Sequence, residues 1–254
     1  MNHTPSPSAS PAKRALEDVR AATAFLTRLP INAAHFDLAR ACWAFPIAGL
    51  FVGGAAGAAF VIPIYLGFSP LAAALLALLA VAFLTGALHE DGLADMADGL
   101  GGSDPARRLE IMRDSRIGAF GVLALIFSVG LRATTLATIA EKGFVALVAV
   151  AILSRGLLPA MMYGLNLASD SGVAATAGKP KRAPALLSSG LAIVGVIIFL
   201  GPATGFGALI FGALAVGGVA LLAKHLIGGY NGDILGAAQQ TTEIAVLLFL
   251  AASL

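Results

Sequence analysis

The chain has 254 residues, of which 58% are hydrophobic and 12% are charged, and its mean hydropathy is +0.90. A soluble domain carries about 25% charged residues, so this composition excludes an ordinary soluble protein and predicts that most of the chain faces lipid or other apolar helices. The formal net charge of +2 is too small to indicate nucleic-acid binding, and the single cysteine, Cys42, excludes an internal disulfide.

The N-terminal region has two parts. Residues 1–12 are rich in Ser and Pro and lack an apolar core, which predicts a disordered tail and argues against a signal peptide. From Lys13 to Leu29, apolar residues recur at helical spacing with basic residues between them. This pattern predicts an amphipathic helix that lies on the membrane surface and ends at Pro30. Residues 13–254 are expected to form a single membrane-embedded domain.

Seven apolar stretches are long enough to cross a bilayer, for which about 20 residues are needed. They predict an all-α, polytopic membrane protein with about seven transmembrane helices. The fifth stretch is short and is separated from the sixth only by Gly201 and Pro202. The pair could form two closely connected spans or one re-entrant element, and the sequence is compatible with both. The stretches are residues 44–66, 70–88, 119–140, 143–164, 186–200, 203–223 and 234–254.

The distribution of basic residues predicts the orientation of these spans, because loops rich in Lys and Arg are retained in the cytoplasm. With the N-terminus inside, the inner segments hold 13 of the 16 basic residues, whereas the outer turns hold only Lys142. We therefore expect a multi-pass membrane protein whose polar loops open to the cytoplasm. The inner basic residues are Lys13, Arg14, Arg20, Arg28, Arg40, Arg107, Arg108, Arg113, Arg116, Lys179, Lys181, Arg182 and Lys224.

An acidic segment follows the second apolar stretch. If it continues as a helix, at about 100° per residue, Asp91, Asp95 and Asp98 share one face. Like charges at this spacing repel each other, so the face calls for a cation, and hard oxygen ligands favour Mg²⁺ or Mn²⁺. A solvated acidic loop is the alternative, but charged groups beside a membrane span are usually functional. His89 lies next to this face and is a candidate general base or hydrogen-bond donor.

Basic side chains follow the acidic face. Arginines beside a metal ion can hold phosphate oxygens and stabilise the charge of a phosphoryl-transfer transition state. Arg113 and Arg116 flank Asp114 and fit such a site. For Arg107 and Arg108, a role in phosphate binding and a role as positive charges that keep the loop on the inner side are equally compatible with the sequence. The segment therefore predicts phosphoryl transfer at the membrane surface.

Further polar groups lie toward the C-terminus. Lys179, in a basic loop, is a candidate ligand of an anionic substrate, although contact with lipid headgroups is equally compatible. Asn231 and Asp233 precede the last apolar stretch, and Glu243 lies within it. A carboxylate inside an apolar helix needs a partner or a polar cavity. Glu243 is therefore a candidate substrate contact, and the competing interpretation is an ion pair with a buried arginine, either Arg132 or Arg155.

Six short motifs, taken in order and spacing, resemble the cobalamin synthases, which are adenosylcobinamide-GDP ribazoletransferases. The resemblance runs from about residue 20 to the C-terminus, and its most specific part is D-G-L-A-D followed by R-D-S-R. The motifs are FLTRLP at residues 25–30, FPIAGL at 45–50, HEDGLAD at 89–95, RDSRIG at 113–118, SRG at 154–156 and GDILGA at 232–237.

The resemblance implies an integral inner-membrane enzyme that depends on Mg²⁺, with residues 13–254 as its catalytic domain. Such an enzyme joins adenosylcobinamide-GDP to α-ribazole or its 5′-phosphate, forming adenosylcobalamin or its 5′-phosphate and releasing GMP. A ribose hydroxyl of the ribazole attacks the phosphorus that carries the cobinamide. The protein contacts the lipid bilayer, and its possible protein partners are a second copy of the chain and other enzymes of cobalamin synthesis.

The resemblance also implies roles for particular residues. Asp91, Asp95 and Asp98 would bind the metal, and Glu90 or His89 would activate the attacking hydroxyl. Family members commonly have Thr where this chain has Asn, at position 231, so a hydroxyl role there is in doubt, although an amide can still donate and accept hydrogen bonds. The remaining assignments are Arg113 and Arg116 as ligands of the diphosphate, Asp114 as the residue that orients them or joins the metal shell, and Asn231 and Asp233 as residues that close the pocket.

Two other functions compete with this interpretation. In the CDP-alcohol phosphatidyltransferases the signature begins D-x-x-D-G and continues with A-R, and residues 95–99 and 106–107 match these parts, but the later aspartates of that signature are missing. A transporter would need polar residues at midplane depth, often in an inverted repeat. Here the acids crowd into one segment and the sequence has no internal repeat, so an enzyme is favoured.

Overall fold

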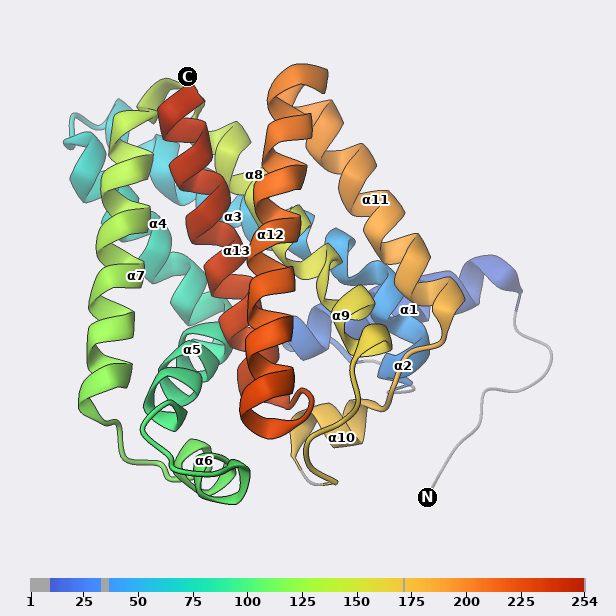
Figure 1. Cartoon of the computed structure of the whole chain (residues 1–254). Helices are drawn as coiled ribbons and strands as arrows, with labels where there is room; N and C mark the ends of the chain where they lie inside the picture. Colours follow the sequence, from blue (N-terminus) through green and yellow to red (C-terminus); the bar gives the residue numbers. More distant parts are fainter. Residues whose placement is uncertain (1–9, 33–36, 171, 254) are drawn as a thin grey trace.

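A computed structural model of the chain describes residues 10–32, 37–170 and 172–253. Every regular element within these ranges is a helix, so the all-α prediction is confirmed (Figure 1). The helices are α1 Pro11–Leu26, α2 Leu38–Ala41, η1 Cys42–Ala44, α3 Phe45–Tyr65, α4 Pro70–Thr85, α5 Leu88–Gly99, α6 Pro105–Met112, α7 Ala119–Thr138, η2 Ala140–Lys142, α8 Gly143–Gly156, α9 Leu158–Gly164, α10 Val173–Ala177, α11 Arg182–Leu200, α12 Pro202–Ile227 and α13 Gly232–Ser253.

Six helical segments of the described chain are long and apolar enough to cross a membrane, which confirms a polytopic membrane protein. α11 and α12 are two of them, and the chain turns between them at Gly201, where φ is 76°. This arrangement favours two spans over one re-entrant element. The segments are Leu38–Tyr65, Ala119–Thr138, Ala140–Gly164, Arg182–Leu200, Pro202–Ile227 and Gly232–Ser253.

The second predicted stretch, residues 70–88, is not one straight helix. α4 ends at Thr85, and α5 begins at Leu88 with a bend of 92° between the two helices. Gly86 (φ 67°) and Ala87 (φ 55°) lie at the bend in left-handed conformations. These cannot continue a right-handed helix, and a left-handed residue with a Cβ costs about 1–2 kcal/mol. The predicted stretch is therefore broken at Gly86 and Ala87, and α4 and α5 together give a seventh span if the bent pair crosses the membrane as one unit. Because alanine is the strongest helix former, the break cannot be recognised from the residue types.

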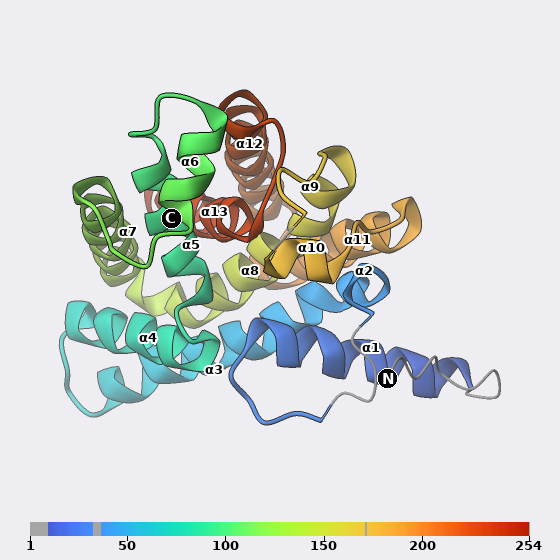
Figure 2. The same cartoon turned by 90° about the horizontal axis from the view of Figure 1, so that it is seen from below.

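The segment that follows α1 holds this bend in place. The N–H of Arg28 donates to the carbonyl oxygen of Leu84 at 2.7 Å. The side chain of Arg28 lies over Gly86, where a Cβ would come within 2.2 Å of the arginine Nε. Figure 2 shows α1 running beside α3, with the junction of α4 and α5 near the C-terminal end of α1. The direction of α5 therefore depends on α1 as well as on α4.

The predicted amphipathic helix is present as α1, with shifted ends. The side chain of Ser10 caps it, so the helix begins at Pro11, inside the segment that was expected to be a tail. Residues 1–9 lie outside the described ranges. The helix ends before Thr27, whose backbone is extended, and not at Pro30 as expected. A capping hydroxyl, not proline, therefore defines one end of this helix.

Glycines bring α5 directly against α13. A Cβ on Gly92 would lie 2.8 Å from the carbonyl oxygen of Asp233, and a Cβ on Gly236 would lie 3.1 Å from that of His89. Small residues let membrane helices approach this closely. Both glycines belong to the motifs that carry the family resemblance, so part of the pattern in these motifs is a packing requirement.

A buried charged network joins α5, α7, α8 and α13. Glu243 accepts hydrogen bonds from Arg132 at 3.0 Å and from Arg155 at 3.3 Å, and these arginines are 2% and 0% exposed. Gln240 donates to Glu90 at 3.0 Å, and Arg132 lies 3.5 Å from the same oxygen. Charges in an apolar interior have to be paired. The predicted ion pair of Glu243 is therefore present, with both candidate arginines, and the network connects the acidic helix to three others.

Replacing Glu243 with Ala is expected to destabilise the fold, because Arg132 and Arg155 would stay buried without their shared carboxylate. Breaking a buried pair in this way costs about 3–5 kcal/mol. The Tm of the detergent-solubilised protein, followed by circular dichroism, should therefore fall. Glu141→Ala, which removes an exposed carboxylate from η2, is the matched control. An unchanged Tm for Glu243→Ala would show that the network does not stabilise the bundle.

Candidate active site

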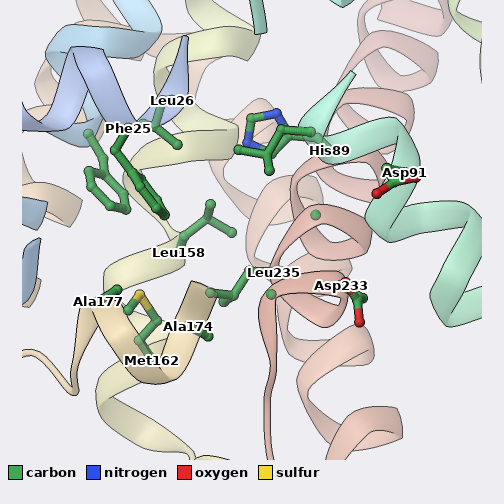
Figure 3. Close-up of a pocket in the computed structure, with 14 residues that line it drawn as sticks. Phe25, Leu26, His89, Asp91, Leu158, Met162, Ala174, Ala177, Asp233 and Leu235 are labelled. Atoms are coloured by element: carbon green, nitrogen blue, oxygen red, sulfur yellow. The ribbon is translucent and has the colours of Figure 1, made fainter. Parts of the chain in front are cut away.

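A cavity of about 150 Å³ lies where α1, α3, α5, α9, α10 and α13 meet. In Figure 3, apolar side chains such as Phe25 and Leu158 line one side of it, and Asp91 and Asp233 lie on the other. His89 is placed between the two groups. The cavity therefore has an apolar half and an acidic half, and residues predicted from the sequence supply the acidic half.

Four carboxylates form a cluster beside the cavity, and two of them, Asp91 and Asp233, line its acidic half. Asp91, Asp95 and Asp98 all belong to α5, so the predicted helix through them is confirmed, and Asp233 lies in the first turn of α13. Asp95 is close enough to the other three for their negative charges to repel it. Within the described chain, the carboxylates of Asp91 and Asp95 form no ion pair and accept no hydrogen bond. The cluster therefore concentrates negative charge, and the carboxylates of Asp91 and Asp95 are not neutralised by an ion pair within the described chain.

The donor chemistry of this cluster suits a hard divalent cation. Carboxylate oxygens are the ligands that Mg²⁺ prefers, and a bound cation would relieve the mutual repulsion. As the side chains are placed, however, no three His, Cys, Asp or Glu groups of the described residues converge closely enough to hold a metal ion. The assignment of Asp91, Asp95 and Asp98 as metal ligands therefore stays a prediction.

Asp98 has a structural task that the sequence did not reveal. Its two carboxylate oxygens accept hydrogen bonds from the N–H groups of Gly118 and Gly121, each at 2.8 Å. These groups begin α7, and a carboxylate is stabilised at a helix N-terminus. A Cβ on Gly118 would lie 2.4 Å from this carboxylate, which explains the glycine of the RDSRIG motif. Asp98 thus attaches the acidic helix to the start of α7.

The two candidate bases lie in different surroundings. His89 lines the cavity and is 3% exposed, and its imidazole makes no hydrogen bond to another described residue. Glu90 instead takes part in the buried network with Gln240 and Arg132. Glu243 belongs to the same network and does not line the cavity. The structure therefore brings His89 to the cavity but not Glu90 or Glu243.

The chain before the last helix is held by its own polar groups. Asn231 accepts a hydrogen bond from the N–H of Ile234 at 2.9 Å and donates to Asp233 at 2.8 Å. The N–H of Tyr230 donates to the carbonyl oxygen of Asn166 at 2.9 Å. Asn231 therefore caps α13 and orients Asp233, a task for which an amide serves in place of the threonine hydroxyl.

The RDSRIG motif reaches the acidic cluster through Arg113. The Nη2 atom of Arg113 donates to Ser169 Oγ at 2.7 Å, and its charge attracts Asp233. Arg116 pairs with Asp114 at 2.7 Å, and 87% of its side chain is exposed. Hydrogen bonds from Arg116 lower the pKa of Asp114 below its ordinary value. The structure thus brings Arg113 to the cluster and leaves Arg116 and Asp114 at the surface.

Arg107 and Lys179 are exposed side chains with local partners. Arg107 forms an ion pair with Glu110 at 2.8 Å, and an exposed pair of this kind contributes only about 0–1 kcal/mol. Lys179 lies 3.5 Å from the amide oxygen of Asn166. Neither cation lines the cavity. Their assignment to substrate binding stays a prediction.

The apolar half of the cavity was not predicted from the sequence. It is built partly by Leu158 and Met162 of α9 and by Ala174 and Ala177 of α10. In a chain that is 58% hydrophobic, such residues look like any lipid-facing position. The only available signal was the mostly polar segment at residues 166–172, which interrupts the apolar sequence between the two helices.

Comparisons with known proteins agree with the motif resemblance. The profile of the cobalamin-5-phosphate synthase family matches residues 18–251. The chain is 46% identical to the adenosylcobinamide-GDP ribazoletransferase of Bradyrhizobium diazoefficiens, over 97% of each chain. It is 43% identical to the protein of that name from Azorhizobium caulinodans, over 92% of this chain and 95% of the relative. For the one from Allorhizobium ampelinum the identity is 38%, over 94% and 98%. No solved structure gives a significant match.

The family match takes in every element that builds the cavity. It begins inside α1, continues through the acidic helix and the cap of α7, and ends near the end of α13. The relatives are matched over nearly their whole length, so the likeness is not confined to a single motif. The chain therefore belongs to the cobalamin-5-phosphate synthase family and is a membrane-embedded transferase of cobalamin biosynthesis.

Proposed function

We propose that this chain is a Mg²⁺-dependent adenosylcobinamide-GDP ribazoletransferase. The observation that carries the proposal is the acidic half of the cavity, which Asp91 and Asp233 line and which Asp95 adjoins, close enough for the charges of Asp91 and Asp233 to repel its own. It is supported by the 46% identity to a relative of that name. The substrates are adenosylcobinamide-GDP and α-ribazole or its 5′-phosphate. The products are adenosylcobalamin or its 5′-phosphate, and GMP.

In the proposed reaction, a ribose hydroxyl oxygen of the ribazole forms a bond to the phosphorus that carries the cobinamide. The bond between this phosphorus and the bridging oxygen of the diphosphate breaks, and GMP leaves with the electron pair. The hydroxyl proton passes to His89, the candidate base that lines the cavity. A neutral imidazole is a suitable proton acceptor near pH 7.

Asp91 and Asp95 would hold the Mg²⁺ ion, with Asp98 and Asp233 as neighbouring carboxylates. When bound, the ion supplies positive charge to the oxygens of the diphosphate. Arg113, which is attracted to Asp233, donates N–H groups to the phosphate oxygens as negative charge moves onto the leaving GMP. The fork of donors on the guanidinium suits a phosphate group.

We place the site on the cytoplasmic side of the inner membrane. Loops rich in Lys and Arg are retained in the cytoplasm, and the segments next to the cavity carry Arg107, Arg113, Arg116 and Lys179. These exposed cations raise the local concentration of an anionic nucleotide substrate. Both substrates are then taken from the cytoplasm.

Purified protein incubated with adenosylcobinamide-GDP, α-ribazole and Mg²⁺ is expected to form cobalamin and GMP, measured by liquid chromatography. A second arm supplies a CDP-alcohol and a free alcohol, because residues 95–99 match the start of the phosphatidyltransferase signature. Release of CMP in the second arm, with no GMP from α-ribazole or its 5′-phosphate in the first, would contradict the proposal.

Asp91→Asn and Asp95→Asn keep the size of each side chain and remove its charge. Each is expected to lower kcat roughly 100-fold or more, because a ligand of the ion that stabilises the transition state is lost. The Tm should change little, since neither carboxylate is hydrogen-bonded in the described chain. Glu141→Gln, at an exposed carboxylate of η2, is the control. Turnover near that of the unaltered enzyme at saturating Mg²⁺ would rule out the metal role.

The orientation can be tested by cysteine labelling in a chain that carries Cys42→Ser. Ser103→Cys and Glu141→Cys place thiols at exposed positions before α6 and in η2. A reagent that cannot cross the membrane, added from the periplasmic side, is expected to label position 141 and not position 103. The opposite pattern would place the site outside the cytoplasm. Labelling after detergent lysis confirms that both thiols are reactive.

A further inference from the structure

The apolar half of the cavity is lined by two aromatic rings and by aliphatic side chains. Phe25 and Phe45 stack with ring centroids 6.1 Å apart and an angle of 18° between their planes. Leu158 and Met162 lie on the same apolar side as Phe25 in Figure 3 and are 3% and 2% exposed. The apolar and acidic halves together have a volume of about 150 Å³, and a cavity of about this volume holds one small aromatic molecule. Its walls therefore match a compact aromatic group in both size and polarity.

The polar groups of the cavity narrow the choice of occupant. Among the described residues whose side chains line it, only His89, Asp91 and Asp233 are polar. A guanine bound among the apolar walls would lose the hydrogen bonds of most of its donors and acceptors, at about 1–3 kcal/mol each. A corrin ring is far larger than the cavity. A lipid tail would fill the apolar half but would offer nothing to the two carboxylates.

We propose that this cavity binds the aromatic base of the ribazole substrate, with the attached ribose directed to His89 and Asp91. This assignment rests on the proposed function and identifies the acceptor site within it. The base of α-ribazole is dimethylbenzimidazole, a flat bicyclic ring with few polar atoms, which suits a site between apolar walls. With the base in the apolar half, the ribose hydroxyl lies at the acidic half, where the proposed reaction needs it.

The short helix α10 sets the space available to the base. Ala174 and Ala177 line the cavity and are 4% and 6% exposed, whereas Ala175, on the same helix, does not line it. A larger side chain at a lining position would occupy the volume that the ring and its methyl groups need. The identity of the base that the enzyme accepts is therefore controlled by small side chains that touch no charged part of either substrate.

Ala177→Leu tests this control, with Ala175→Leu as the matched change on the same helix. The assay compares α-ribazole with the riboside of unsubstituted benzimidazole, which lacks the two methyl groups. Ala177→Leu is expected to raise the KM for α-ribazole more than the KM for the smaller riboside, by a further factor of at least about 10. One or two methyl groups in a filled pocket change substrate discrimination by about this factor. The KM for adenosylcobinamide-GDP should not change, and Ala175→Leu should behave as the unaltered enzyme.

A binding measurement separates this inference from the proposed function. Isothermal titration of α-ribazole into the full-length protein in detergent, without the corrinoid substrate, should show weaker binding to Ala177→Leu than to Ala175→Leu. If the unaltered protein makes no cobalamin, the proposed function fails. If it makes cobalamin but Ala177→Leu affects both ribosides equally, or raises the KM for adenosylcobinamide-GDP instead, the base does not occupy this cavity.

Met162→Ala is the second variant, to be used if Ala177→Leu does not give a monodisperse protein. Removing this side chain enlarges the apolar half, so a riboside with a tricyclic base, such as naphthimidazole, is expected to become a better substrate relative to α-ribazole. An unchanged ratio of kcat/KM between these two ribosides would overturn the assignment.

Discussion

The architecture of this enzyme depends on how an apolar bundle accommodates charge. An unpaired charge deep in the bundle would cost several kcal/mol, yet two arginines and two glutamates are placed there. Glu243 of α13 satisfies Arg132 of α7 and Arg155 of α8 together, and Glu90 of α5 joins them. These groups can neutralise one another only if the four helices meet at one level. The contacts that balance the interior therefore also place the helix that carries the acids of the cavity.

The long helices could be predicted from the sequence because a lipid-facing segment needs apolar side chains at almost every position. The limits expected for the third and last spans agree with α7 and α13 within a few residues. The bend between α4 and α5 could not be predicted in this way. It rests on the backbone conformations of Gly86 and Ala87 and on the side chain of Arg28, which is distant in sequence.

The acidic half of the site was easier to find than the apolar half. In a chain with 12% charged residues, three aspartates at helical spacing stand out, and α5 has them on one helix. The different roles of the three aspartates could not be predicted. Asp98 bonds to backbone N–H groups of α7, and backbone groups are present whatever the sequence. Leu158 and Met162 were also out of reach, since shape and not residue type distinguishes a cavity wall from a lipid contact.

The contacts of α5 with α7 restrict the motion of the acidic helix. Asp98, near the end of α5, is bonded to the first turn of α7, and Glu90, near its start, reaches Arg132 in the later part of α7. A helix attached at one point can rotate about its own axis, but a helix attached at both ends cannot. Asp91 and Asp95 lie between these attachments, so their angular position is set before any substrate arrives. Little orientational entropy is then left to lose when the ion and the diphosphate bind.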